Sequence, residues 1–112
     1  MQIKRFTITG AVSTNGSYTI DGDDLNDLKG LNLKEIITIP GAGSLAPDDE
    51  YTGTVTDSYG RILTITARTD DTVESIDVET TINREWIIID KITIALAAIG
   101  SGNTVTVVII AV

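Results

Sequence analysis

Side chains branched at Cβ constrain this chain more than any other feature, because isoleucine, valine and threonine make up 43 of its 112 residues. Such side chains suit the pleated surface of a strand, and no sustained helical periodicity accompanies them. Glycine, asparagine, aspartate and serine interrupt the apolar runs at the spacing of roughly 8–12 residues that is typical of sandwiches and barrels. The sequence therefore predicts an all-β fold, a single jelly-roll-like β-sandwich domain over residues 1–112 with about eight antiparallel strands.

Alternating apolar and polar residues locate the candidate strands along the whole chain. The ranges lie between turn residues. The candidates are Gln2–Thr9, Ser17–Asp21, Leu33–Ile39, Tyr51–Asp57, Arg61–Ala67, Val73–Glu79, Trp86–Ile89, Lys91–Ala98 and Thr104–Val112.

The strongest turn signals predict two hairpins. One joins Tyr51–Asp57 to Arg61–Ala67, and the other joins Lys91–Ala98 to Thr104–Val112 around Gly100–Asn103. Alternation in the first hairpin places three threonines on one face, namely Thr52, Thr54 and Thr56.

Two segments between the strands have a different character. Only Asp23–Lys29 suits a helical turn, with acidic residues first and a lysine last, and we expect it to be too short to affect the fold. Pro40–Glu50 is predicted to be one long loop within the domain.

The residue inventory excludes most catalytic chemistry. The chain has no cysteine and no histidine, which removes disulfides, Cys/His zinc sites and nucleophilic pairs that need either residue. We therefore expect no enzymatic activity and no cofactor. A net charge of −8 repels phosphate backbones and anionic lipids, and the most apolar run, Ile92–Ile99, is far shorter than a membrane span. We expect neither a nucleic acid nor a membrane as partner.

Acidic residues gather in three clusters. Carboxylates on loops are ligands that calcium uses, but the first cluster lacks the glycine and the glutamate of an EF-hand loop. We interpret all three as solvated acidic loops and assign no metal ligand, with calcium binding as the alternative. The clusters are Asp21, Asp23, Asp24 and Asp27, then Asp48, Asp49 and Glu50, then Asp70 and Asp71.

The last two candidate strands are largely apolar on both faces. One face of an antiparallel sheet normally meets water, so strands of this kind need a second cover. A small all-β chain has little left to supply that cover, which makes a second copy the natural candidate. We therefore predict a homo-oligomer, with a trimer as the expected state; the alternative is that these are central strands covered by the long loop. The predicted interface residues are Ala95, Ala97, Val108, Ile110 and Val112.

Residues 50–64 and 90–108 resemble a group of short structural proteins of tailed bacteriophages. The first segment, EYTGTVTDSYGRILT, is a threonine-rich strand and turn, and the second, DKITIALAAIGSGNTVTVV, is a turn followed by an alternating Thr/Val strand. The similarity lies in strand composition and turn placement, brings no catalytic or ligand residues, and does not extend to Asp21–Asp27. It implies a virion component, such as a capsid decoration (cement) protein.

The resemblance implies the major capsid protein as partner and a place on the capsid exterior after synthesis in the host cytoplasm. The acidic charge suits that surface better than the DNA-filled interior. Candidate capsid contacts are Leu45 and Pro47 in the long loop and Trp86, which is alternatively a core residue. The competing functions are a carbohydrate- or receptor-binding module of a tail fibre and a head–tail or tail structural subunit.

Overall fold

The computed structural model describes residues 1–48, 50–69 and 71–112. The described chain forms eight antiparallel strands in two four-stranded sheets, which confirms the predicted all-β sandwich. Two short helices, α1 (Gly22–Leu28) and α2 (Val78–Ile82), and a 3-10 turn at Gly43–Leu45 lie in the connections. The strands are β1 (Gln2–Thr9), β2 (Gly16–Ile20), β3 (Leu33–Pro40), β4 (Tyr51–Asp57), β5 (Ile62–Arg68), β6 (Glu74–Asp77), β7 (Ile92–Ala97) and β8 (Thr104–Ala111).

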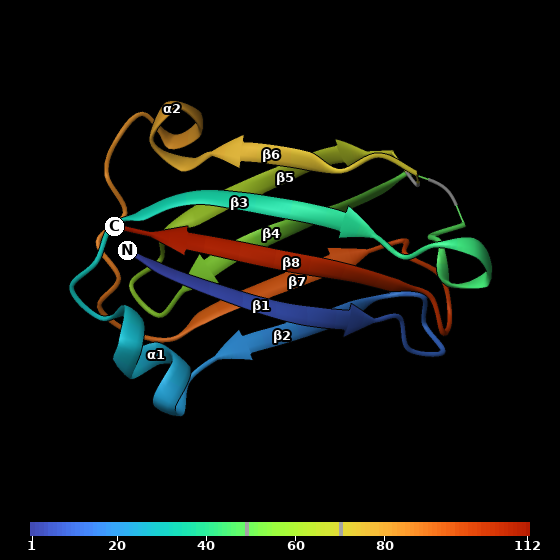
Figure 1. Cartoon of the computed structure of the whole chain (residues 1–112), viewed down its shortest axis with the longest axis horizontal. Coiled ribbons are helices and arrows are strands. Elements are labelled where there is room, and N and C mark those ends of the chain that lie inside the picture. The colour runs from blue at the N-terminus through green and yellow to red at the C-terminus, as the bar shows by residue number, and fades with distance from the viewer. Residues whose placement is uncertain (49, 70) are drawn as a thin grey trace.

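The strand order is that of a jelly roll. One sheet runs β1-β8-β3-β6 and lies toward the viewer in Figure 1, and the other runs β2-β7-β4-β5 behind it. The strands pair from the ends of the chain inward, β1 with β8, β2 with β7, β3 with β6 and β4 with β5. Lateral pairing of β8 with β3 and of β7 with β4 completes the sheets. Six of the seven connections between the described strands therefore pass from one sheet to the other.

The C-terminal hairpin predicted from the sequence is wrong. β7 and β8 belong to different sheets, so Lys91–Ala98 and Thr104–Val112 do not pair. The chain between them crosses over, with Gly100 and Gly102 at φ angles of 91° and 78°, which favour glycine. The Gly10 N–H donates to the Asn103 carbonyl at 2.9 Å and holds the crossover against the end of β1. A reversal between facing sheets uses the same turn residues as a reversal within one sheet.

The candidate strand Trp86–Ile89 is also wrong, because it joins neither sheet. The Leu33 N–H donates to the Trp86 carbonyl and the Ile88 N–H donates to the Leu31 carbonyl, both at 2.8 Å. These bonds fix an extended segment beside the start of β3, with a single isolated bridge instead of a ladder. The segment is extended as predicted, but it lies beside β3 without adding a strand to either sheet.

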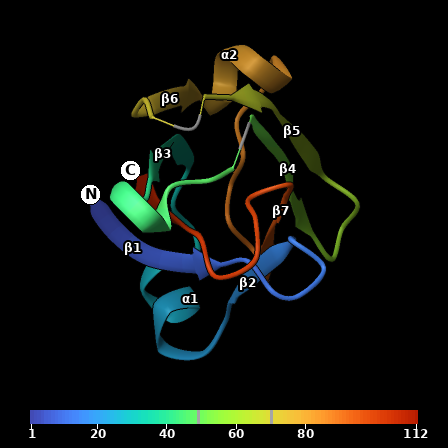
Figure 2. The same ribbon diagram turned by 90° about the vertical axis from the view of Figure 1, so that its right-hand side faces the viewer.

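The core lies between the two sheets, which Figure 2 shows end-on. Inward residues of each strand fill it, as in β7, where Ile92, Ile94 and Leu96 are buried and alternate with partly exposed residues. At the open edge of the sandwich, the rings of Phe6 on β1 and Tyr18 on β2 stack with centroids 4.4 Å apart. Alternation therefore gives each sheet one buried face and one outer face.

Both helices contribute more buried side chains to the core than the sequence predicted. In α1, Leu25 and Leu28 are buried in the core, so the helical turn expected to have no effect on the fold covers part of it. The predicted strand Val73–Glu79 is shortened to β6 because its last residues begin α2. The Asp77 side chain caps that helix and Val78 is buried. Short helices thus supply apolar cover where the strands end.

Replacing Leu28 with alanine tests the role of α1. We expect Leu28→Ala to lower the free energy of unfolding by about 2–5 kcal/mol, because it removes buried methyl groups and leaves a cavity. Urea denaturation followed by circular dichroism measures the change. Asn26→Ala on the exposed side of the same helix is the control, with a change below about 0.5 kcal/mol. A Leu28→Ala variant as stable as this control would contradict the role given to α1.

Candidate functional site

The outer face of the β2-β7-β4-β5 sheet is mostly uncharged, and at its edge the Arg68 guanidinium of β5 donates a hydrogen bond to the Thr66 hydroxyl at 3.3 Å. Its outward residues come from all four strands, and register aligns Ser17, Ala95, Thr54 and Thr64 in one row across the sheet. We call this surface the threonine face. It consists of Ser17, Thr19, Thr52, Thr54, Thr56, Ile62, Thr64, Thr66, Thr93, Ala95 and Ala97.

A hollow of about 710 Å³ lies on the threonine face. Residues of all four strands line it, and the β1–β2 connection adds Ala11 and Asn15. Ala95 and Ala97 lie among longer threonine side chains, so their single methyl groups leave space above the sheet. The lining offers hydroxyl groups, methyl groups and backbone, and it contains no charged residue. Such a surface suits an uncharged partner.

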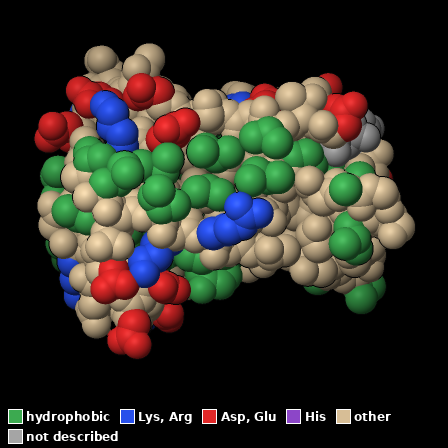
Figure 3. All heavy atoms as spheres, in the orientation of Figure 1, with side chains coloured by type: hydrophobic (Ala, Val, Ile, Leu, Met, Phe, Trp, Pro, Cys, Tyr) green, Lys and Arg blue, Asp and Glu red, His purple; other side chains and the backbone are tan. Residues whose placement is uncertain are grey.

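The opposite outer face, on the β1-β8-β3-β6 sheet, is apolar in the middle and charged at its sides. Register places Ile3, Ile110 and Glu35 in one row, and Arg5, Val108 and Ile37 in the next. Figure 3 shows hydrophobic side chains gathered over β3 and β8 with basic and acidic groups around them. We call this surface the β8 face. It consists of Ile3, Arg5, Glu35, Ile37, Ile39, Asp77, Val108 and Ile110.

The predicted interface residues lie on opposite sides of the molecule. Ala95 and Ala97 belong to the threonine face, whereas Val108 and Ile110 belong to the β8 face, because their strands are in different sheets. Val112 follows β8 and is 51% exposed. A two-fold contact between identical surfaces therefore cannot include all five residues, and the oligomer interface stays a prediction. Both strands are central in their sheets, as the alternative interpretation held, but the long loop does not cover them as that interpretation also required.

Of the three candidate capsid contacts, only Leu45 is exposed. It lies in the 3-10 turn of the long loop, which sits at one end of the sandwich and not over either face (Figure 1). Pro47 is buried, and Trp86 has no exposed surface. Trp86 is therefore a core residue, and neither Trp86 nor Pro47 offers a side chain to a partner.

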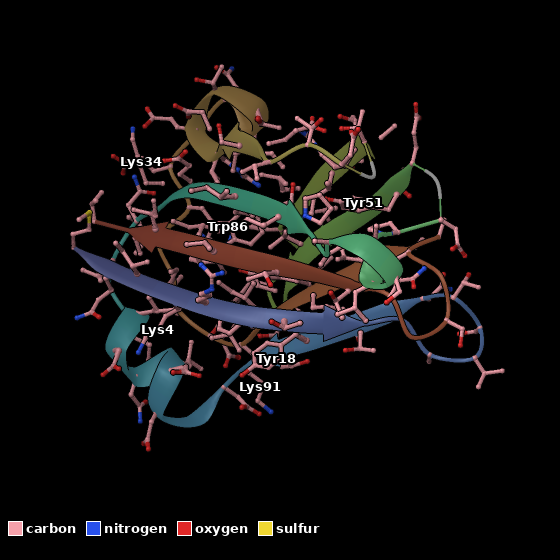
Figure 4. All side chains as sticks on the ribbon, turned by 45° about the vertical axis from the view of Figure 1, so that its right-hand side comes forward. Lys4, Tyr18, Lys34, Tyr51, Trp86 and Lys91 are labelled. Atoms are coloured by element: carbon pink, nitrogen blue, oxygen red, sulfur yellow. The ribbon has the colours of Figure 1, made fainter. Side chains whose placement is uncertain are left out.

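A buried ion pair lies beside Trp86, a feature that sequence reasoning missed. Asp57, whose side chain has no exposed surface, accepts a hydrogen bond from Arg61 Nε at 2.6 Å and two more from the backbone N–H groups of Tyr59 and Arg61, both at 3.0 Å. The Arg61 guanidinium lies 5.0 Å from the Trp86 ring centroid, inside the sandwich that Figure 4 shows around Trp86. The cluster fixes the β4–β5 turn, and the available signal was the placement of Asp57 and Arg61 on either side of that turn.

The acidic clusters do not form a metal site among the described residues, where no group of three or more potential ligands is placed to hold an ion. In the first cluster, Lys4 Nζ lies 2.6 Å from Asp27 and 3.4 Å from Asp24. The hydrogen bond from Lys4 to Asp27 is the largest effect that raises the pKa of Lys4. Asp49 and Asp70, members of the other clusters, lie outside the described residues. The first cluster therefore neutralises a lysine of β1.

Comparisons with known proteins add no family to this description. No protein-family model matches the chain, and no curated protein matches it. Among the described residues, none of the helices has the length and apolar character needed to cross a membrane. The functional argument therefore rests on the two outer faces of the sandwich.

Removing the Asp57 carboxylate tests the buried ion pair. We expect Asp57→Ala to lower the free energy of unfolding by about 3–5 kcal/mol, because it leaves the largely buried Arg61 guanidinium without its counter-charge. Urea denaturation measures the loss. Asp23→Ala, which removes an exposed carboxylate, is the control and should leave the midpoint unchanged. Equal midpoints for the two variants would contradict a structural role for the pair.

Proposed function

We propose that the protein is a structural component of a tailed-phage virion, a capsid decoration protein that attaches to the outside of the shell formed by the major capsid protein. The observation that carries this proposal is the threonine face, an uncharged and hollowed surface four strands wide on a chain with a net charge of −8. Depletion of charged side chains marks the centre of protein–protein interfaces. We assign the threonine face to the contact with the shell.

The fold and the charge give secondary support. Jelly rolls occur in viral capsid proteins and also in lectins, so the fold agrees with the proposal by analogy only. The net charge opposes a position against packaged DNA and suits the capsid exterior. The resemblance of residues 50–64 and 90–108 to phage structural proteins points the same way.

The hollow favours one competing function, a carbohydrate-binding module of a tail fibre, because hydroxyl groups suit a sugar. Binding pockets for small ligands are lined predominantly by hydrophobic and aromatic side chains, and no aromatic residue lines this hollow. Trp86 and Tyr51 are buried, Phe6 and Tyr18 stack on each other, and the exposed Tyr59 lies in the β4–β5 turn. The shell contact therefore remains the first proposal.

A charge on the threonine face should weaken attachment to the shell. Shells assembled from the major capsid protein of the same genome are mixed with purified protein, and the bound fraction is measured by co-sedimentation. We expect the protein to saturate the shells and Ala95→Glu to weaken binding by at least about tenfold, because a carboxylate would be buried without a partner. Ser101→Glu in the β7–β8 crossover carries the same charge outside the hollow and should bind like the original chain.

Other outcomes separate the competing functions. Absence of co-sedimentation, or equal binding by Ala95→Glu and the original chain, would contradict the assignment. Protein counting in purified virions gives an independent measurement. A copy number comparable to that of the major capsid protein supports decoration, whereas a handful of copies indicates a fibre or a head–tail subunit. Binding to glycans that Ala95→Glu abolishes would support the carbohydrate module instead.

A further inference from the structure

Two opposite charges on the β8 face have no partner for their side chains among the described residues. Arg5 points outward from β1 opposite Val108, and Glu35 points outward from β3 opposite Ile110. Neither side chain forms an ion pair or a hydrogen bond with another described residue. Because β8 lies between β1 and β3, the charges stand on opposite sides of the apolar middle of the face.

The negative side of the β8 face has an excess of charge. Glu35 pairs across the strands with Asp77 of β6, and like charges at paired positions destabilise a sheet. Lys34 lies near this corner, but its Nζ is 3.7 Å from a carboxylate oxygen of Glu79. A cation that arrives from outside the chain would therefore stabilise the corner that holds Glu35.

The apolar middle of the face is suited to burial. Ile3 is 56% exposed, and Ile37, Ile39 and Ile110 are partly exposed around Val108. Figure 3 shows this part of the surface as a continuous area of hydrophobic side chains. Apolar surface between two opposite charges is complementary to another copy of itself, because a two-fold contact uses the same patch twice.

Rotation by 180° about an axis along β8 satisfies both charges. It places the β1 side of one copy over the β3 side of the other and keeps each residue at the same height along the strands. Facing sheets lie about 10 Å apart and successive outward residues about 7 Å apart, so Arg5 and Glu35 of the two copies would have Cα atoms about 12 Å apart. Extended arginine and glutamate side chains span that distance. Val108 and Ile110 would meet their own counterparts near the axis.

We propose that two copies of this chain form a dimer through their β8 faces, in which Arg5 of each copy pairs with Glu35 of the other. A different partner would have to supply both a cation and an anion at the spacing that a second copy already provides. This contact replaces the expected trimer with a dimer. It does not depend on attachment to a capsid, which is assigned to the opposite face.

Charge reversal tests the contact, with sedimentation velocity as the measurement. Arg5→Glu and Glu35→Arg alone bring like charges together, and each should raise the dissociation constant of the dimer by at least about tenfold. The combined Arg5→Glu/Glu35→Arg variant restores opposite charges and should return the constant to within about threefold of the original. Arg84→Glu and Glu85→Arg, exposed in the α2–β7 connection, make the same charge changes elsewhere and should have little effect.

Thermal unfolding of each variant confirms that it is folded before its association is compared. A monomer at high micromolar concentration, a trimer, or a dimer that neither single reversal weakens would overturn the proposal. So would a combined variant that stays as weak as the single ones. Because the shell assay uses Ala95→Glu on the threonine face, failure of one proposal leaves the other standing.

Discussion

The pairing of β8 between β1 and β3 is the constraint on which the rest of the structure depends. β8 is the last strand of the chain, and it joins the first strand to the third over their whole lengths. Its inward residues Val105, Val107 and Ile109 are fully buried, and its outward residues make the middle of the β8 face apolar. Without β8, neither the β1-β8-β3-β6 sheet nor the β8 face can form. Such non-local pairing is typical of all-β domains, which fold slowly.

Alternation and turn residues in the sequence were enough to locate most strands. They did not identify the partner of each strand, because most partners are distant in the sequence. Gln2–Thr9 and Tyr51–Asp57 have the bounds that alternation predicts, and the threonines of β4 share a face as expected. The glycines of residues 100–103 specify a reversal without specifying the sheet to which the chain returns. Ala95 and Ala97 join the threonine face only because β7 pairs with β4, a partner distant in sequence. Trp86 likewise lies against Arg61, which comes from another part of the chain.

The two faces differ in the physics of any contact they make. The threonine face presents hydroxyl and methyl groups without charge, so its binding should respond weakly to ionic strength, whereas opposite charges contribute to the β8 face and are screened by salt. A dimer through the β8 face directs its two threonine faces away from each other. Taken together, the proposed dimer and the proposed shell contact describe a bivalent unit, in which two threonine faces bind two neighbouring sites on a shell. Bivalent attachment raises the overall affinity without any new type of contact.

The six connections that pass between the sheets have a mechanical consequence. Backbone hydrogen bonds in a sandwich run within each sheet, so they offer no resistance to a pull perpendicular to the layers. In this fold the covalent chain connects the two sheets at both ends of the sandwich. Tension applied between the threonine face and the β8 face therefore passes through peptide bonds. A molecule bound through both faces can therefore transmit a pulling force from one partner to the other without separation of its two sheets.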